Sequence, residues 1–149
     1  MSHEKLVEYS KNLEAFIAQA KQINDENAIL PGGDGQWSPA FVLHHVADAE
    51  MHFAIRYFNA LVIDKPLVIP FDEDEYPDVL NYEGRDWANS LALVASIGKL
   101  VQVTLTPITS EQWERTSIHP ELGEVSISTL IGKAGDHMAA HTEQLIDSM

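Results

Sequence analysis

The stretch SPAFVLHHVADAEMHF, residues 38–53, predicts a long amphipathic helix with a histidine on its buried face. Ser38 followed by Pro39 is typical of a helix start, because a serine oxygen accepts from the free N–H groups of the first turn and proline suits the first helical position. The residues expected on the buried face recur at steps of three and four: Val42, His45, Val46, Ala49, Phe53, Tyr57 and Ala60. His45 is therefore predicted to point into a core, and His44 to lie on its flank.

The same spacing recurs in three other parts of the chain, so we predict an all-α protein. We expect helices over about residues 6–23, 38–60, 87–105 and 128–149. Four amphipathic helices in a chain of this length favour a four-helix bundle formed by a single domain, residues 1–149. Two connections, about residues 63–85 and 106–126, are longer than most links between bundle helices. We expect the second to hold one short helical turn and a tight bend at Gly123.

Long crossover connections of this kind allow two topologies. Such a connection can carry the chain back along the length of the bundle, which leaves the helices on either side of it parallel. It can instead fold over one end of the bundle and cover a site there. The sequence alone leaves both topologies open.

The composition excludes several classes of function. The 149 residues include 23 acidic and 9 basic side chains, for a formal net charge of -14. Such a charge repels phosphate groups, so we expect neither nucleic-acid binding nor attachment to anionic membranes. We find no apolar run that approaches the roughly 20 residues of a membrane-spanning helix. The absence of cysteine excludes disulfides and thiolate metal ligands, and a cytoplasmic protein fits these properties best.

A second histidine motif, GDHMAAHTEQL at residues 135–145, lies in the last predicted helix. His137 and His141 are four residues apart on its apolar face, and two imidazoles at this spacing can bind one ion. His45 from a facing helix would complete three ligands and leave one position open, which is the pattern of catalytic rather than structural zinc. The alternative is three core histidines with internal hydrogen bonds. Because the flanking Val, Ala and Met side chains offer no partners, we favour a shared divalent cation.

The residues around the histidines limit the chemistry. Met138 occupies the position of the glutamate in the HExxH motif, so hydrolysis of peptides by that mechanism is not expected. Asp48, one turn after His45, is the candidate catalytic residue, because it could orient that imidazole or a water molecule on the ion. The alternative is a polar residue at the mouth of the bundle.

Three further side chains have two interpretations each. His52 and Arg56 continue the same side of the helix and could contact an anionic group of a substrate, or serve in packing. His119 could lie over the site or on an exposed loop. The acidic tract FDEDEYPD, residues 71–78, lacks the glycine and the distal glutamate of an EF-hand loop. We interpret it as a solvated acidic loop that could help to close the cavity.

Two motifs, WSPAFVLHHVADAE at residues 37–50 and GDHMAAHTEQL, resemble the signatures of the DinB/YfiT-like superfamily, and the resemblance extends over nearly the whole chain. It implies a four-helix bundle that binds a divalent ion, often nickel or zinc, through three histidines. By position, these ligands are His45, His137 and His141. The superfamily name implies no DNA-binding activity.

The resemblance also implies a class of reaction. Members with assigned activities are transferases and isomerases that depend on bacillithiol, mycothiol or glutathione, and many others are called metal-dependent hydrolases. We therefore predict a metal-dependent enzyme, either a thiol-dependent S-transferase or a hydrolase, that acts on a small electrophilic substrate. The alternative is a non-catalytic binding or stress-response bundle with a structural or vestigial metal. A homodimer is one option for its assembly.

Overall fold

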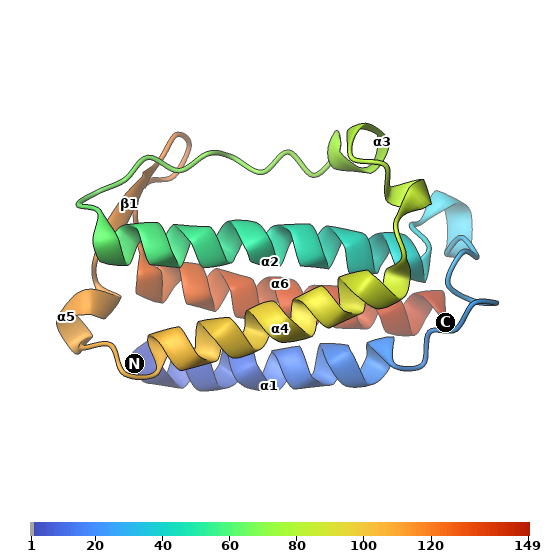
Figure 1. Ribbon diagram of the computed structural model, residues 1–149, viewed down its shortest axis with the longest axis horizontal. Coiled ribbons are helices and arrows are strands. Elements are labelled where there is room, and N and C mark those ends of the chain that lie inside the picture. Colours follow the sequence, from blue (N-terminus) through green and yellow to red (C-terminus); the bar gives the residue numbers. More distant parts are fainter. Residues whose placement is uncertain (1) are drawn as a thin grey trace.

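The computed structural model describes residues 2–149 and confirms the predicted four-helix bundle (Figure 1). Its long helices are α1 (Ser2–Ala20), α2 (Pro39–Val62), α4 (Trp87–Leu105) and α6 (Ile127–Ser148). α1 packs against α6 and α4, and α2 packs against the same two helices. α2 and α4 run in one direction and α1 and α6 in the other (Figure 1). A short 3₁₀ turn, η1 (Gly33–Gly35), lies between α1 and α2.

Side-chain caps set the starts of three of these helices. The Oγ atom of Ser38 accepts from the backbone N–H of Phe41 at 3.3 Å, as the sequence predicts for the start of α2. The hydroxyl of Ser126 caps α6 in the same way, and the carboxylate of Asp86 caps α4. These caps set the register in which the histidines of α2 and α6 enter the bundle.

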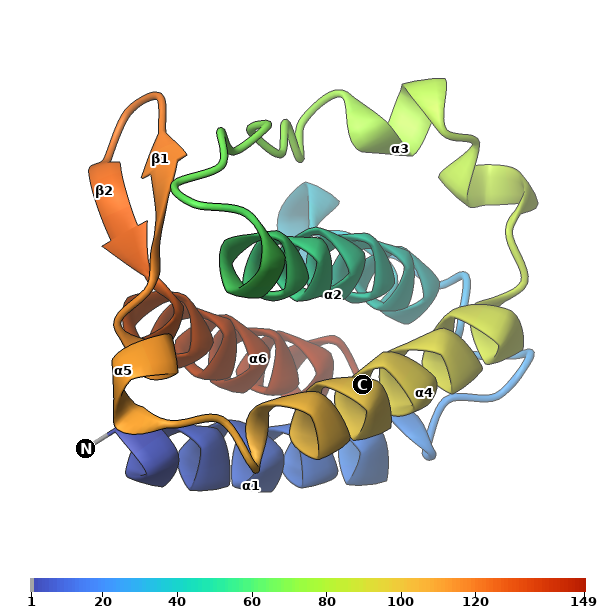
Figure 2. The ribbon, with the colours of Figure 1, turned by 60° about the vertical axis from the view of Figure 1, so that its left-hand side comes forward.

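The first long connection takes the first of the two topologies. It runs from the end of α2 back along the length of that helix, through α3 (Tyr76–Val79) and the 3₁₀ turn η2 (Tyr82–Gly84), to the start of α4 (Figure 2). We refer to residues 63–86 as the crossover. α2 and α4 consequently begin at the same end of the bundle and run parallel. The crossover covers a side of α2 that would otherwise face solvent.

The second connection takes the other course and folds over the opposite end of the bundle. The short helical turn predicted here is α5 (Ser110–Trp113), and the bend at Gly123 has a φ of +73°. The bend joins β1 (Thr116–His119) to β2 (Gly123–Ser126), which form an antiparallel hairpin that the sequence did not predict. Four-residue strands are too short to show a clear alternation in sequence.

α4 corrects one expectation about apolar runs. Of the helices in residues 2–149, it is the one whose 19 residues are long and apolar enough to cross a membrane by length and composition alone. Small residues separate its leucines and valines, and Lys99 is its one charged side chain. One face packs into the bundle through Val94, Val101 and Leu105. Gly98 lies against Leu13 of α1, too close for a β-carbon to fit without displacing that side chain.

Candidate metal centre

Three histidines from two neighbouring helices meet between α2 and α6. His45 lies in the first half of α2, His137 lies at the middle of α6, and His141 lies one turn further along α6. Nε2 of His137 is 3.0 Å from Nε2 of His45 and 3.0 Å from Nε2 of His141. The three ligating atoms all lie within 4.8 Å of one another. The ring of His45 is fully buried, and the other two rings are half-buried.

These separations fit the ligand set of one divalent ion. Two nitrogens that each lie about 2.0–2.1 Å from a tetrahedral zinc ion are roughly 3.3 Å apart. Among the described residues, the cluster contains imidazole nitrogens only, a donor set that suits zinc, nickel, copper and iron. The residues present therefore fit a bound metal.

The rings are also held in the neutral form that a metal ligand needs. Burial, reinforced by the charges of the other two imidazoles, lowers the pKa of His45 to about 3. Burial lowers the pKa of His137 to about 4 and also lowers that of His141. At neutral pH, no proton has to leave these rings before a cation binds.

The opposite nitrogen of each ring has a different environment. Nδ1 of His141 lies 2.7 Å from Oε1 of Gln144, so Nδ1 carries the hydrogen and Nε2 presents its lone pair to the cluster. Nδ1 of His45 and Nδ1 of His137 are buried and have no hydrogen-bond partner within residues 2–149. Gln144 is thus the side chain that orients a ring of the cluster directly.

Aromatic side chains and one carboxylate enclose His45. The ring of Phe71, from the crossover, stacks on the His45 ring at 5.6 Å between centroids, and the ring of Trp37 lies at 5.2 Å. Oε2 of Glu73 is 3.6 Å from Nε2 of His45. His52 positions this part of the crossover, because its ring stacks on Phe71 and its Nε2 lies 2.8 Å from the hydroxyl of Tyr76.

Asp48, the candidate catalytic residue, is held by the other end of the crossover. Its Oδ2 accepts from the Tyr82 hydroxyl and its Oδ1 from the Arg85 guanidinium, each at 2.8 Å. The side chain is almost fully buried. Within residues 2–149, the structure gives it no hydrogen bond to the three imidazoles. A role for Asp48 in orienting His45 stays a prediction.

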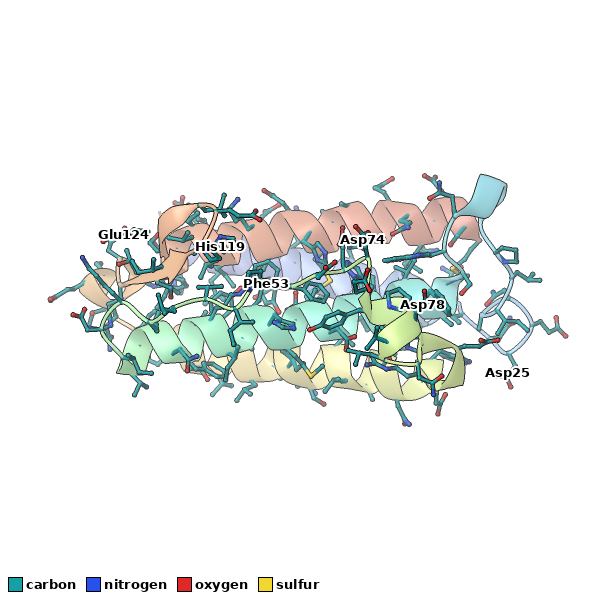
Figure 3. All side chains as sticks on the ribbon, turned by 90° about the horizontal axis from the view of Figure 1, so that it is seen from above. Asp25, Phe53, Asp74, Asp78, His119 and Glu124 are labelled. Atoms are coloured by element: carbon teal, nitrogen blue, oxygen red, sulfur yellow. The ribbon has the colours of Figure 1, made fainter. Side chains whose placement is uncertain are left out.

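His119 lies on the hairpin at the end of the bundle away from the cluster. Figure 3 shows it far along the molecule from Asp74, the neighbour of Glu73. Its Nδ1 accepts from the backbone N–H groups of Glu121 and Leu122, so the ring stabilises the hairpin turn. The structure does not place His119 over the cluster; it is the half-buried last residue of β1 and not an exposed loop residue.

Glu73 and Gln144 belong to this site but were not predicted from the sequence. Gln144 lies three positions after His141, on the same face of the helix, and that spacing could have identified it. Glu73 belongs to the acidic tract, whose loop has no periodicity from which one carboxylate could be selected.

The cluster has access to solvent at the end of the bundle where α6 finishes. A hollow of about 610 Å³ is lined by Trp37, His141, Gln144, Glu143 and Asp147, among others. A second hollow, of about 290 Å³, adds Glu73 to this surface. The described residues that line the two hollows include acidic side chains and no lysine or arginine. The acidic side chains make the electrostatic potential of this mouth negative.

The chain belongs to the DinB superfamily, whose family model matches residues 8–145. It is 26% identical over 146 residues to "Putative metal-dependent hydrolase YfiT" of Bacillus subtilis, across 94% of this chain and 82% of YfiT. It is 32% identical over 126 residues to a "Putative metal-dependent hydrolase" of Oceanobacillus iheyensis, across 83% of this chain and 73% of that protein. The predicted family is confirmed.

Solved structures share the fold. YfiT from Bacillus subtilis, described as a four-helix bundle of unusual topology, superposes with a TM-score of 0.82 at 23% identity, covering 97% of this chain and 85% of YfiT. A mycothiol-dependent maleylpyruvate isomerase superposes with a TM-score of 0.80 at 12% identity, covering 97% of this chain and 60% of the isomerase. At these identities, the likeness is one of fold.

The bond between Gln144 and His141 leads to a testable prediction. We expect Gln144→Leu to weaken zinc binding by about 10- to 100-fold, the usual cost of losing the partner that orients a ligand. Competition with a chromophoric chelator would measure the affinity. Gln102→Leu, on α4, serves as the control and should bind zinc as the wild type does. Unchanged affinity in Gln144→Leu would show that His141 needs no such partner.

Proposed function

We propose that this protein is a metal-dependent enzyme in which His45, His137 and His141 bind one divalent ion, with zinc or nickel as the best candidates. The observation that carries the proposal is the convergence of three neutral imidazoles beside an open hollow. The names of the relatives, metal-dependent hydrolases, support a metal. A bound ion of this kind supplies Lewis acidity, which makes a water or a thiol acidic enough to act as a nucleophile near neutral pH.

Four other side chains shape the site at which a small electrophilic substrate would bind. Trp37 and Phe71 exclude water from two sides of His45. Gln144 keeps Nε2 of His141 directed at the cluster. Asp48 acts as a positioning residue, because its bonds to Tyr82 and Arg85 fasten the crossover to α2.

Glu73 is the carboxylate best placed to accept the proton of the nucleophile. Its Oε2 lies 3.6 Å from Nε2 of His45, and the side chain is exposed on the surface of the hollow. A general base of this kind contributes about 10²–10⁴-fold to a rate. Met138 occupies the position of the general-base glutamate of zincins, so α6 supplies no general base of that kind. Glu73 would take this role from the crossover.

The nucleophile is water in a hydrolase or a small thiol in an S-transferase. The chain has no cysteine, so the sulfur would enter with a cosubstrate such as bacillithiol, mycothiol or glutathione. The fold shared with a mycothiol-dependent isomerase supports the second option. The strongly acidic composition supports an enzyme that acts without a nucleic-acid or anionic-membrane partner. A cytoplasmic location and a homodimer stay predictions.

An activity panel tests this proposal. Zinc-loaded and nickel-loaded wild type would be assayed on ester and amide substrates, and on chlorodinitrobenzene with each of the three thiols. We expect metal-dependent turnover with at least one combination, and a loss of about 10²-fold or more in kcat for Glu73→Gln. Glu75→Gln, in the same exposed acidic tract, is the matched control and should keep full activity.

The panel also separates the enzyme from the alternative. Turnover with water identifies a hydrolase, and turnover only with a thiol identifies an S-transferase. Absence of metal-dependent turnover in every combination would overturn the proposal in favour of a non-catalytic bundle with a structural or vestigial metal. Full activity of Glu73→Gln would remove Glu73 from the mechanism and leave the metal centre in place.

A further inference from the structure

Another cavity, of about 210 Å³, lies further along α2 and is separate from the imidazole cluster. It is bounded by α2, by residues 66–69 of the crossover and by Ser117 of β1. Arg56, its charged residue, is eleven positions after His45, which is about 16 Å along a helix. None of the three histidines of the cluster lines this cavity.

Arg56 presents a positive charge without a counter-charge. One guanidinium nitrogen donates to the carbonyl oxygen of Ile69 at 3.1 Å. The Nε atom is buried and has no partner within the described residues. The structure also gives this side chain no ion pair in residues 2–149, although the chain carries a net charge of -14. A half-buried cation in this state favours an anion from outside the chain.

Ser117 supplies a second unused donor in the same cavity. Its side chain is fully buried, and its Oγ atom has no hydrogen-bond partner among the described residues. A buried donor left unsatisfied costs about 1–3 kcal/mol. A carboxylate has two acceptor oxygens, so one such ligand would accept hydrogen bonds from both this hydroxyl and Nε of Arg56.

The rest of the lining is largely aliphatic. Ile55 of α2 and the crossover residues from Pro66 to Ile69 supply the apolar part, and Ile55, Leu67 and Ile69 form its solvent-exposed rim. His52 and Asn59 of α2 add two polar side chains, and no carboxylate belongs to the described lining. At about 30 Å³ for each water in the liquid, the cavity has room for roughly seven non-hydrogen atoms. This size and lining suit a carboxylate with a short hydrocarbon tail better than an inorganic anion.

We propose that this cavity is a binding site for a small aliphatic monocarboxylate, whose oxygens accept from Nε of Arg56 and Oγ of Ser117. The hydrocarbon tail packs against Ile55 and the crossover.

Isothermal titration calorimetry with isovalerate tests the site. We expect isovalerate to bind, isovaleramide to bind at least about tenfold more weakly because it lacks the charge, and inorganic phosphate to bind more weakly than isovalerate. Binding should be equal in metal-loaded protein and in protein treated with a chelator, which distinguishes this site from the metal centre.

Three variants complete the test. Arg56→Met and Ser117→Ala should each weaken isovalerate binding, the first by roughly 10- to 100-fold. Arg115→Met is the matched control, because Arg115 also donates to backbone carbonyls, those of Ala60 and Ile63, but does not line the cavity. If Arg56→Met fails to fold, Ser117→Ala and the amide decide the outcome.

Four results would overturn the proposal. The first is the absence of binding at about 10 mM isovalerate, where a millimolar site would be filled. The second is equal affinity for the acid and its amide. The third is wild-type affinity in Ser117→Ala together with Arg56→Met. Tighter binding of phosphate than of isovalerate would overturn the assignment to a monocarboxylate.

Discussion

The double variant His137→Ala/His141→Ala, purified without a histidine tag, is expected to lose its metal. Replacing an outer partner of a ligand costs about 10- to 100-fold in metal affinity, so removing two ligands should cost at least 100-fold. His45 alone would remain, and one imidazole does not hold a divalent ion against dilution and washing. We expect close to one zinc or nickel ion per wild-type chain, and close to none in the variant, by mass spectrometry of the metal content.

A matched control tests whether the loss is specific. His3 and His119 are histidines outside the cluster, and His3→Ala/His119→Ala removes the same number of imidazoles. That variant should retain the metal content of the wild type. Equal metal content in the cluster variant and the wild type would contradict the site.

A second prediction concerns the stability of the fold and Glu50, a fully buried carboxyl group in the core beside α1. Its Oε2 accepts from the Tyr9 hydroxyl at 2.7 Å, while Oε1 and the nearby Tyr57 hydroxyl have no partners within residues 2–149. Burial raises the pKa of Glu50 from 4.5 to about 7, against the opposing effect of the bond from Tyr9. The folded protein therefore keeps a proton on Glu50 that the unfolded chain has already released.

The proton on Glu50 determines whether the free energy of unfolding rises or falls with pH. Between pH 4.5 and about 7 the folded state binds the proton and the unfolded state does not, so raising the pH destabilises the fold. Each pKa unit corresponds to about 1.4 kcal/mol, which makes the total about 3 kcal/mol. The contribution of Glu50 is fully present below pH 4.5 and lost as the pH passes 7.

Urea unfolding of metal-free wild type and Glu50→Gln, from pH 4.5 to pH 8, measures this effect. Glutamine has nearly the same shape as the protonated acid, so the two proteins should be about equally stable at pH 4.5. We expect the wild type to be less stable than the variant by about 3 kcal/mol at pH 8. Taking the difference removes the titration of the buried imidazoles, whose lowered pKa values act in the opposite direction. A difference that does not vary with pH would show that Glu50 is ionised throughout.

The helices could be predicted from the sequence because the features that indicate a helix lie within one short stretch of chain. Ser38 and Pro39 mark the start of α2, and the spacing of apolar residues marks its buried face. The hairpin could not be predicted, because the pairing of Thr116 with Ser126 is a contact across a turn between two very short strands. The path of the crossover was also open, since a connection of that length permits either topology.

In the candidate site, too, the residues on helices could be predicted and those on the crossover could not. His45, His137 and His141 fall on helix faces, where periodicity indicates which side chains converge. The surroundings of Asp48 could not be predicted in this way, because Tyr82 and Arg85 reach it from the crossover. Glu73 approaches His45 from a loop for the same reason. Periodicity locates ligands on helices and says nothing about the loop that covers them.

X-ray absorption spectroscopy of the metal-loaded wild type, at the zinc or nickel edge, tests the metal centre most directly. The spectrum should show three imidazole nitrogens per ion at about 2.0–2.1 Å. His45→Ala, if it retains an ion, should show two. A wild-type spectrum with one imidazole or none would contradict the assignment of these three histidines to a single ion.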